Sequence, residues 1–255
     1  MAPLLSIVTV VKDDSSGFES TLHSLRQLLN THQSEVEWIV VDSSLDRNAI
    51  PSHIKDIDTA LTYSWTEPHG VFAAMNAGIA QASGTYLYFL NAGDTLASHG
   101  VLERALDRLR RDQPTWLYGQ VAFIDATGRP TVPSPFDYEK ERRALFSRGR
   151  FPPHQGTIVN REVVEEMGGF DTTYRICADY TLALGLSLRA TPIEIHDVLA
   201  NFPTGGLSDR QWRKSIGEFH RARREIFRPK GFRSLQELLR TAKQFLHLSL
   251  SRLLR

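Results

Sequence analysis

The sequence LLSIVTVV at residues 4–11 is a nearly continuous run of apolar and β-branched residues. A run of this kind is typical of a strand that is buried on both faces of a sheet. The sequence DDSSG at 13–17 ends the strand, and leucines at helical spacing follow as far as residue 29. This succession predicts a buried strand that leads directly into a helix.

The same succession repeats through residue 124. VEWIVV at 36–41 and YLYFL at 86–90 have the composition of further buried strands, and polar residues follow each of them. Weaker patterns predict additional strands and helices, at residues 60–66, 70–82, 101–111 and 116–124. Strands that alternate with helices predict an α/β fold, with a Rossmann-like, mainly parallel sheet flanked by helices.

The second half is less regular and ends in a basic tail. A turn at 128–130 closes a predicted hairpin, and residues 179–188 are apolar nearly all round, as in a buried helix. We therefore divide the chain into a domain at 1–208 and a helical extension at 209–255. From Arg210 onward the extension has thirteen Lys and Arg residues against three Glu. This asymmetry predicts an anionic partner for the tail.

The composition excludes several classes of protein. Of the 255 residues, 41% are hydrophobic and 23% are charged, which is the balance of a globular protein rather than a disordered one. A net charge of +1 argues against nucleic acid as the partner. Cys177 is the only cysteine, which excludes an intrachain disulfide and a zinc site built on cysteines.

The sequence also predicts where the protein works. Residues 1–11 lack the basic segment and cleavage site of a signal peptide. No stretch reaches the roughly 18 apolar residues that a membrane-spanning helix needs. Together with the single cysteine, these features predict a cytoplasmic protein.

Polar clusters follow four of the predicted strands at the point where each strand ends. They are 12–14, Asp42, Glu67 and 91–94. Ligands of parallel α/β sheets bind beyond the carboxyl ends of the strands, so we expect these clusters to line one site. The plainer interpretation, that loops are polar in any case, stays open for each cluster taken alone.

Six segments together resemble the family 2 glycosyltransferases of the GT-A fold, in the branch that contains enzymes of colanic-acid and other surface-polysaccharide assembly. Their order and spacing make the resemblance specific, and they span most of residues 4–208. The segments are SIVTVV (6–11), EWIVVDSS (37–44), EPHGVFAAMNAGIAQASGTYLYFLNAGD (67–94), PHQGTIV (153–159), GGFDTTYRICADYTLALGL (168–186) and GGLS (205–208). The resemblance implies an inverting enzyme that moves a sugar from a nucleoside-diphosphate sugar, with UDP and GDP both open, to a glycan acceptor.

The resemblance also implies residues that bind the donor. Asp42 matches the acid that binds the nucleotide base, and a carboxylate can accept hydrogen bonds from a base N–H. The alternative for Asp42 is a helix N-cap. Lys12 and Asp13 fall where the family places base-contacting residues, although the usual Pro-x-Tyr-Asn is missing. Gly70 opens a helix whose N-terminal N–H groups suit a diphosphate, and Asn76 is the polar side chain expected on that face.

Asn91-Ala92-Gly93-Asp94 takes the position of the Asp-x-Asp motif of the family. Only Asp94 remains as an acid, and the resemblance makes it a ligand for Mg²⁺ or Mn²⁺, with Asn91 beside it on the donor side. Such a cation neutralises charge on the leaving diphosphate. The alternative for Asp94 is a cap for the helix that follows.

Asp179 matches the last acid of the catalytic motif of the family, where a carboxylate takes the proton of the acceptor hydroxyl. The neighbouring acid of that motif is Ala178 here, and a helix cap is the alternative role for Asp179. His154 and Gln155 match a pair at the junction of donor and acceptor, where they would contact the diphosphate or an acceptor hydroxyl.

The tail extends the expectation to a membrane. Residues 234–254 place leucines and Phe245 near i, i+3, i+4 spacing, with basic residues largely off that stripe. A basic amphipathic helix can lie on an anionic membrane, which suits a lipid-linked acceptor and a peripheral location at the inner face of the plasma membrane. A helix packed on the domain or on a second subunit is the alternative. Two other functions stay open, namely a nucleotidyltransferase and a non-catalytic nucleotide-binding partner.

Overall fold

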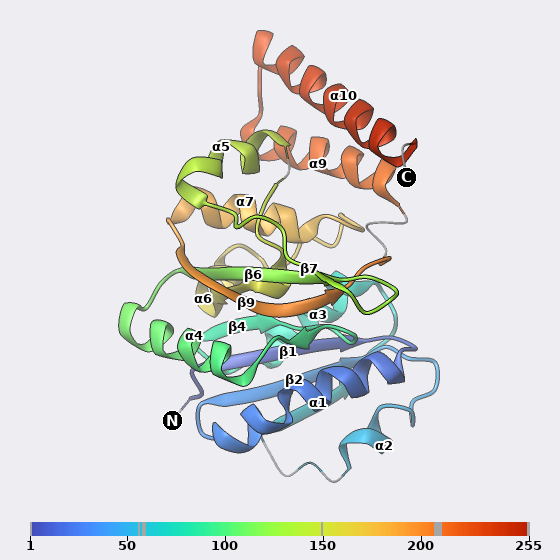
Figure 1. Cartoon of the computed structure of the whole chain (residues 1–255), viewed down its shortest axis with the longest axis vertical. Coiled ribbons are helices and arrows are strands. Elements are labelled where there is room, and N and C mark those ends of the chain that lie inside the picture. Colours follow the sequence, from blue (N-terminus) through green and yellow to red (C-terminus); the bar gives the residue numbers. More distant parts are fainter. Residues whose placement is uncertain (1, 56, 58–59, 149, 207–210, 254–255) are drawn as a thin grey trace.

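The computed structural model describes residues 2–55, 57, 60–148, 150–206 and 211–253. These residues form a nine-stranded mixed sheet of order β3-β2-β1-β4-β8-β6-β9-β5, with β7 paired to β6. The strands are β1 Leu5–Val11, β2 Val36–Asp42, β3 Leu61–Trp65, β4 Tyr86–Phe89, β5 Thr95–Leu96, β6 Trp116–Ile124, β7 Pro130–Thr131, β8 Thr157–Asn160 and β9 Ile193–Pro203. The sheet crosses the middle of the molecule, with α1 and α2 at one end and α9 and α10 at the other (Figure 1).

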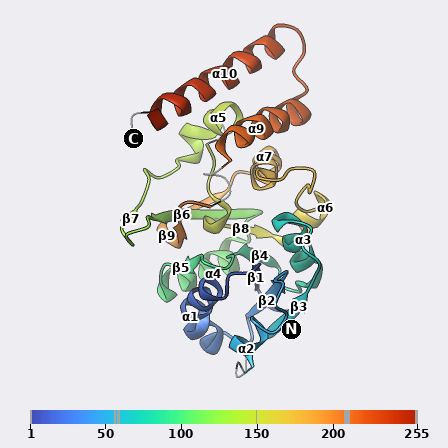
Figure 2. The same ribbon diagram turned by 90° about the vertical axis from the view of Figure 1, so that its right-hand side faces the viewer.

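Helices connect and flank these strands, as the alternation of sequence patterns predicts. They are α1 Ser15–Thr31, α2 Pro51–Ile54, α3 Val71–Gln81, α4 His99–Asp112, α5 Tyr138–Arg148, the 3₁₀ turn η1 His154–Gly156, α6 Arg161–Glu166, α7 Ala178–Arg189, α9 Trp212–Phe227 and α10 Phe232–Leu253. Figure 2 shows α1 and α4 on one side of strands β1 to β4 and α3 on the other. The predicted α/β class is therefore confirmed.

Two separate cores cover the two faces of the sheet, and alternate residues of β1 belong to different cores. Val8 and Val10 pack with Phe72 of α3 in one core. Leu5 and Ile7 lie in the other core with α1 and α4. All seven residues of β1 are buried, which explains why its sequence is apolar throughout instead of alternating.

Parallel pairing is confined to part of the sheet. Strands β3, β2, β1 and β4 are parallel neighbours, as predicted, with Val8 opposite both Ile39 and Phe89. Strand β8 is antiparallel to both β4 and β6, whereas β6 and β9 are parallel. The second half of the sheet is thus mixed. The predicted hairpin at 128–130 is the antiparallel pair β6–β7.

The basic extension packs against the domain through α9. Glu218 of α9 accepts hydrogen bonds from the backbone of the loop before α7. Helix α10 packs on α9 through an ion pair between Arg223 and Glu237 that is almost completely buried. Among the described residues, no helix combines the length and the apolar composition needed to cross a membrane.

Candidate functional site

A cavity of about 610 Å³ lies beyond the carboxyl ends of β1, β2 and β4, where the sequence predicts a site. Lys12, directly after β1, and Ser43, directly after β2, lie in its wall. Asn91, Tyr174 and Arg175 close the other side. We call this space the first cavity.

The N-terminus of α3 forms one wall of the first cavity. Gly70 precedes the helix with φ 106°, and an added Cβ would meet nothing within 4 Å. The positive φ therefore requires glycine here, rather than a lack of space. No side chain caps the helix, so the N–H groups of residues 71–73 have no partner within it. These free N–H groups and the helix dipole make this wall suitable for a diphosphate.

A second cavity of about 490 Å³ adjoins the first. The two cavities share Val71, Phe72, Asn91 and Arg175 in their walls. His154, Gln155 and Asp179 line the second cavity, together with Arg150 and three aromatic residues, Phe123, Phe151 and Phe202. Aromatic faces beside a few polar groups are typical of pockets for small molecules.

Three predicted site residues meet at the boundary between the cavities. Nδ1 of His154 lies 3.4 Å from Oδ2 of Asp179, and Nε2 lies 3.4 Å from Nδ2 of Asn91. The side chains of His154 and Asp179 are 19% and 20% exposed, so both can reach a ligand. Both contacts are longer than a strong hydrogen bond. His154 is thus placed to orient Asp179 without immobilising it.

The position of Asp179 depends on a residue that the sequence patterns do not indicate. Asp179 is in the first turn of α7, and the cap of that helix is Cys177. The carboxylate of Glu218, from α9, accepts hydrogen bonds from the N–H groups of Arg175, Ile176 and Cys177 at 2.8–3.0 Å. Glu218 therefore holds the loop that leads to Asp179. In the sequence it is one of a few acids in a basic helix, which is also the pattern of a solvated surface residue.

Asp94 is buried and lines neither cavity, but it contacts Asn91, which lines both. Its Oδ2 accepts a hydrogen bond from the backbone N–H of Asn91, and its backbone oxygen accepts one from Thr21. Burial raises the pKa of Asp94 to about 7, although the charge of His154, the N–H of Asn91 and the side chain of Gln155 oppose the shift. The predicted alternative, a helix cap, does not describe Asp94, because Ser98 is the N-cap of α4.

The residues around Asp94 fit a divalent cation in part. Oδ1 of Asn91 is buried and has no hydrogen-bond partner in the described part of the chain. An unpaired buried oxygen is costly unless a ligand satisfies it. Carboxylate and amide oxygens are the donors that Mg²⁺ and Mn²⁺ prefer. Asn91 and Asp94 would therefore be the protein ligands of a cation here.

Two predicted base-binding residues lie outside the cavity walls. Asp42 is fully buried, and its oxygens accept hydrogen bonds from the N–H of Ser44 and the hydroxyl of Tyr63. Asp13 adopts φ 51°, and its Oδ1 accepts a hydrogen bond from the backbone N–H of Leu45. This hydrogen bond joins the loop after β1 to the loop after β2. Of the base-binding side chains predicted from the resemblance, Lys12 alone is in the wall of the first cavity. Asp42 does not cap a helix, since its bonds form a turn directly after β2.

The expected position of Asn76 needs correction. Its amide donates to the carbonyl of Phe170 and accepts from the N–H of the same residue. Asn76 therefore fastens the loop at 168–171 to α3 and is in the wall of neither cavity. The resemblance placed Asn76 on the helix face toward the donor, but a backbone segment 94 residues away occupies its side chain. Of the predicted loop GGLS, Gly206 lines the second cavity, while Leu207 and Ser208 lie outside the described residues.

Comparison with known sequences gives consistent matches over most of the chain. The family model described as Glycosyl transferase family 2 matches residues 6–168. An uncharacterized glycosyltransferase of Mycobacterium tuberculosis is 29% identical over 225 residues, 86% of this chain and 83% of that protein. A PGL/p-HBAD biosynthesis glycosyltransferase of Mycobacterium bovis is 31% identical over 216 residues, 82% of this chain and 80% of that protein.

Two solved structures have the same fold. The mannosyltransferase PcManGT of Pyrobaculum calidifontis, in complex with GDP-Man and Mn²⁺, matches with a TM-score of 0.68 and 20% identity. The match covers 97% of this chain and 71% of that one. S. aureus TarS in complex with UDP matches with a TM-score of 0.68 and 16% identity, over 95% of this chain and 70% of that one. These similarities confirm the GT-A architecture that the sequence predicts.

Proposed function

Because the chain belongs to glycosyl transferase family 2, we propose that its first cavity binds a nucleoside-diphosphate sugar and its second cavity binds the acceptor. One observation carries this assignment, namely the wall that the cavities share at Asn91 and Arg175. A diphosphate at the N-terminus of α3 would place its sugar at this wall. Asp179 faces the same boundary from the acceptor side.

The transfer we propose inverts the anomeric centre. Asp179 takes the proton of an acceptor hydroxyl while that oxygen attacks the anomeric carbon. The new bond joins this oxygen to the anomeric carbon, and the bond to the diphosphate oxygen breaks on the opposite side. His154 orients Asp179 through its Nδ1. The N–H groups of residues 71–73 and the guanidinium of Arg175 stabilise the negative charge that develops on the leaving group.

Asn91 and Asp94 hold a divalent cation in this proposal, Mn²⁺ or Mg²⁺. When bound, such a cation supplies positive charge that neutralises the diphosphate. The unpaired oxygen of Asn91 supports this part of the proposal. The nucleoside diphosphates of the two structural matches, UDP and GDP-Man, make UDP and GDP sugars the donors to test first.

The acceptor we propose is a lipid-linked surface glycan, assembled at the cytoplasmic face of the membrane. The similarity to the PGL/p-HBAD biosynthesis glycosyltransferase supports a biosynthetic role. The colanic-acid branch itself stays a prediction. The comparisons favour neither a nucleotidyltransferase nor a non-catalytic partner.

A thermal-shift panel tests the donor site. UDP, GDP, dTDP and CMP are each added with and without Mn²⁺ to the full chain. We expect one diphosphate to raise the Tm, and Mn²⁺ to enlarge the shift in the native chain but not in Asp94→Asn. If no nucleotide changes the Tm at any metal concentration, the first cavity is not the donor site.

The same panel has an expected pH dependence. A cation binds the ionised carboxylate, so the proton on Asp94 must leave before Mn²⁺ binds. Below the Asp94 pKa of about 7, the affinity for Mn²⁺ should therefore increase by up to about tenfold for each unit that the pH rises. The raised pKa means that, without metal, the folded state loses stability as pH rises from about 4 to about 7. Asp94→Asn should therefore raise the metal-free Tm at pH 8 while it abolishes the effect of Mn²⁺. Mn²⁺ binding that is equally tight at pH 6 and pH 8 contradicts the assignment of Asp94.

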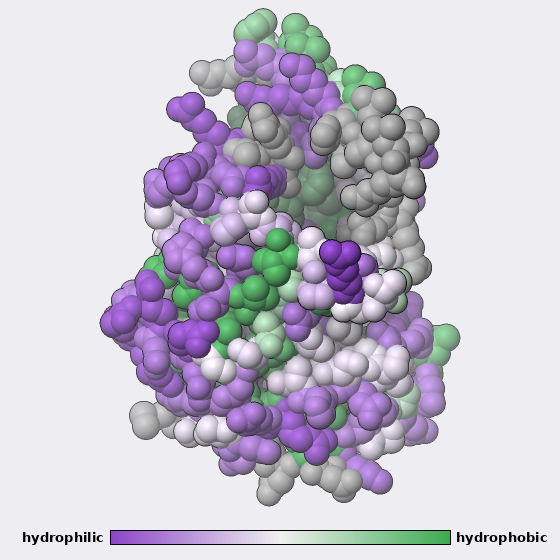
Figure 3. All heavy atoms as spheres, in the orientation of Figure 1, coloured by the Kyte–Doolittle hydropathy of each residue, from purple (hydrophilic) through white to green (hydrophobic). Residues whose placement is uncertain are grey.

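We further propose that α10 contacts an anionic membrane. Its polar side faces the protein, where Glu237 and Thr241 bond with α9. Among the side chains of α10 that the structure describes, four leucines are 52–61% exposed, which argues against the alternative of leucines packed on the domain. Figure 3 shows apolar side chains on the surface at the α10 end of the molecule. The exposed residues are Phe232, Leu235, Leu238, Leu239 and Leu246. Phe245 is 41% exposed and also packs against Trp212 of α9.

Vesicle sedimentation tests this contact. The double variant Leu239→Ser, Leu246→Ser should reduce binding to phosphatidylglycerol vesicles at least tenfold, because each buried leucine contributes about 1.5–3 kcal/mol. High salt should weaken binding as well, since basic side chains near an anionic surface contribute about 1 kcal/mol each. Leu45→Ser is the control, because Leu45 is 82% exposed but belongs to the loop after β2 and not to α10. Equal binding by all three proteins contradicts the proposal.

A further inference from the structure

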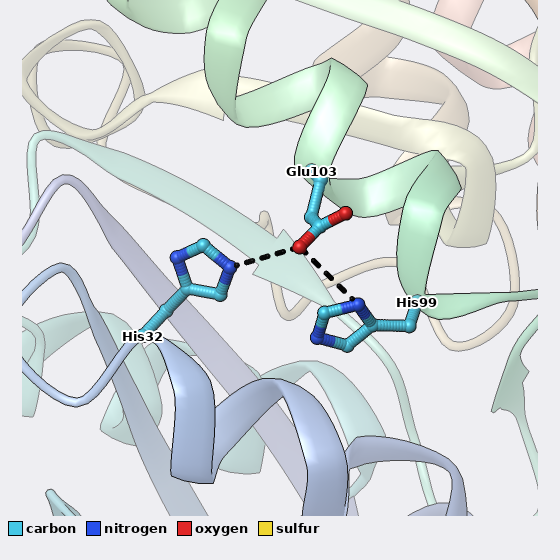
Figure 4. Close-up of side chains that lie close together, drawn as sticks. All are labelled: His32, His99 and Glu103. Carbon is cyan, nitrogen blue, oxygen red and sulfur yellow. Dashed lines mark hydrogen bonds and ion pairs between the residues drawn. The ribbon is translucent and has the colours of Figure 1, made fainter.

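Outside both cavities, three potential metal ligands converge between α1 and α4. His32 is the C-cap of α1, while His99 and Glu103 lie one turn apart at the start of α4. Oε1 of Glu103 is 3.5 Å from Nε2 of His32 and 3.4 Å from Nδ1 of His99 (Figure 4). Among the described residues, this is the one group of three or more His, Cys, Asp or Glu side chains whose ligating atoms all lie within 4.8 Å of one another.

The distances suit ligands of one metal ion better than hydrogen bonds. Both contacts are near or beyond the limit of a useful hydrogen bond. Two ligands at about 2.1 Å from a tetrahedral zinc ion are separated by about 3.4 Å. The observed separations of 3.4 and 3.5 Å therefore match a shared ion.

The surroundings of His32 supply a second argument. Its Nδ1 faces Oε2 of Glu35 at 3.4 Å, and Arg110 holds that carboxylate with contacts of 2.6 and 3.0 Å. The negative charge of this anchored carboxylate, 3.4 Å from Nδ1, favours a proton on Nδ1 by electrostatic attraction and leaves the lone pair on Nε2. That lone pair points at the carboxylate of Glu103. Two acceptors that face each other need a cation between them, either a proton or a metal.

His99 has an environment consistent with the same ion. Its Nε2 is buried without a hydrogen-bond partner in the part of the chain that the structure describes. The ring is therefore oriented through Nδ1, the atom that faces Glu103. The side chain of Glu103 is 45% exposed, which leaves solvent access for an entering ion and for a water ligand.

We propose that His32, His99 and Glu103 bind a Zn²⁺ ion, with water in the remaining coordination position. Two imidazoles and one carboxylate, without a thiolate, suit Zn²⁺ and disfavour Mg²⁺ or Ca²⁺, which prefer oxygen ligands. The site is separate from the cation proposed at Asn91 and Asp94, since none of its three ligands lines either cavity.

The ion would pin the end of α1 to the start of α4. Helix α1 already holds the segment between Asp94 and α4, because Thr21 bonds the backbone oxygen of Asp94 and Ser24 accepts from the N–H of Leu96. A second attachment at His32 and His99 fixes both ends of this segment. Zn²⁺ is therefore expected to stabilise the folded chain by binding the native state.

Titration of the metal-free full chain with ZnCl₂ tests the proposal. Calorimetry and thermal shift are applied to the native chain, to His32→Ala, to His99→Ala and to His196→Ala as the control. His196 is 82% exposed and lies elsewhere. We expect Zn²⁺ to raise the Tm of the native and control proteins, and zinc affinity to fall at least tenfold in the other two variants. Unchanged affinity in both variants, or no binding to the native chain, overturns the proposal.

Two additions keep this experiment decisive. The variant Asp94→Asn should bind Zn²⁺ with unchanged affinity. This result would show that the zinc site is distinct from the cation site proposed at Asn91 and Asp94. If a histidine variant fails to fold, X-ray absorption on the zinc-loaded native chain replaces it. A shell of nitrogen and oxygen with two imidazoles supports the proposal, and a shell without imidazole overturns it.

Discussion

Asp179→Asn is expected to lower kcat for sugar transfer by at least a hundredfold and to leave nucleotide affinity unchanged. The amide cannot accept the proton of the acceptor hydroxyl, and a positioned general base contributes roughly 10²–10⁴-fold to the rate. Asp179 lines the second cavity and not the first, so the variant should still bind the nucleoside diphosphate. Initial rates with saturating donor, together with the thermal shift caused by the nucleotide, measure the two effects separately.

Asp112→Asn provides the matched control for this variant. Its side chain is 24% exposed, against 20% for Asp179, and it pairs with arginines at the far end of α4. We expect its kcat to be close to that of the native chain. If Asp179→Asn keeps native turnover, or if it loses nucleotide binding together with activity, Asp179 is not the base of an acceptor hydroxyl.

The parallel part of the fold could be predicted because its information is local. A strand buried on both faces, such as 4–11, needs apolar residues at every position, and the helix after it needs a leucine stripe. Strand β9 has no such signal, because buried and half-exposed residues are mixed along it. Its partners, β6 and β5, are set by contacts such as Leu96 opposite Ala200, which no local pattern encodes.

The site could be predicted to a similar extent. The resemblance indicated His154 and Asp179, and the fold brings them together although they are 25 residues apart. Arg175 lines the first cavity, and Glu218 of α9 holds the loop that contains it. Both roles depend on where α9 packs, which no local sequence pattern indicates. Asn76 shows the converse, since a polar residue on the expected helix face is used by a distant backbone segment.

The buried ion pair between α9 and α10 leads to the largest expected effect on stability. The side chain of Arg223 is 0% exposed and that of Glu237 is 7% exposed. Glu237→Gln leaves the guanidinium buried without a compensating charge, which typically costs about 3–5 kcal/mol. The hydroxyl of Thr241, which accepts from Nη2 of Arg223 at 3.2 Å, cannot replace that charge.

Urea unfolding followed by tryptophan fluorescence measures this loss. The ring of Trp212 of α9 packs against that of Phe245 of α10 with centroids 5.5 Å apart and a tilt of 35°, so it reports on the packing of the two helices. The control is Glu165→Gln, which breaks an exposed i,i+4 pair with Arg161 and should change the free energy of unfolding by about 0.5 kcal/mol or less.

The double variant Arg223→Met, Glu237→Leu separates the cost of an unpaired charge from the value of the pair. Apolar residues of similar size can replace a buried ion pair at little cost, and sometimes with a gain. We therefore expect the double variant to recover most of the stability that Glu237→Gln loses. If it is as unstable as the single variant, the pair itself stabilises the junction of α9 and α10. The loop held by Glu218 would then depend on that junction, and kcat should fall along with stability. A double variant with native stability and native kcat shows instead that apolar packing alone can hold α9 against the domain.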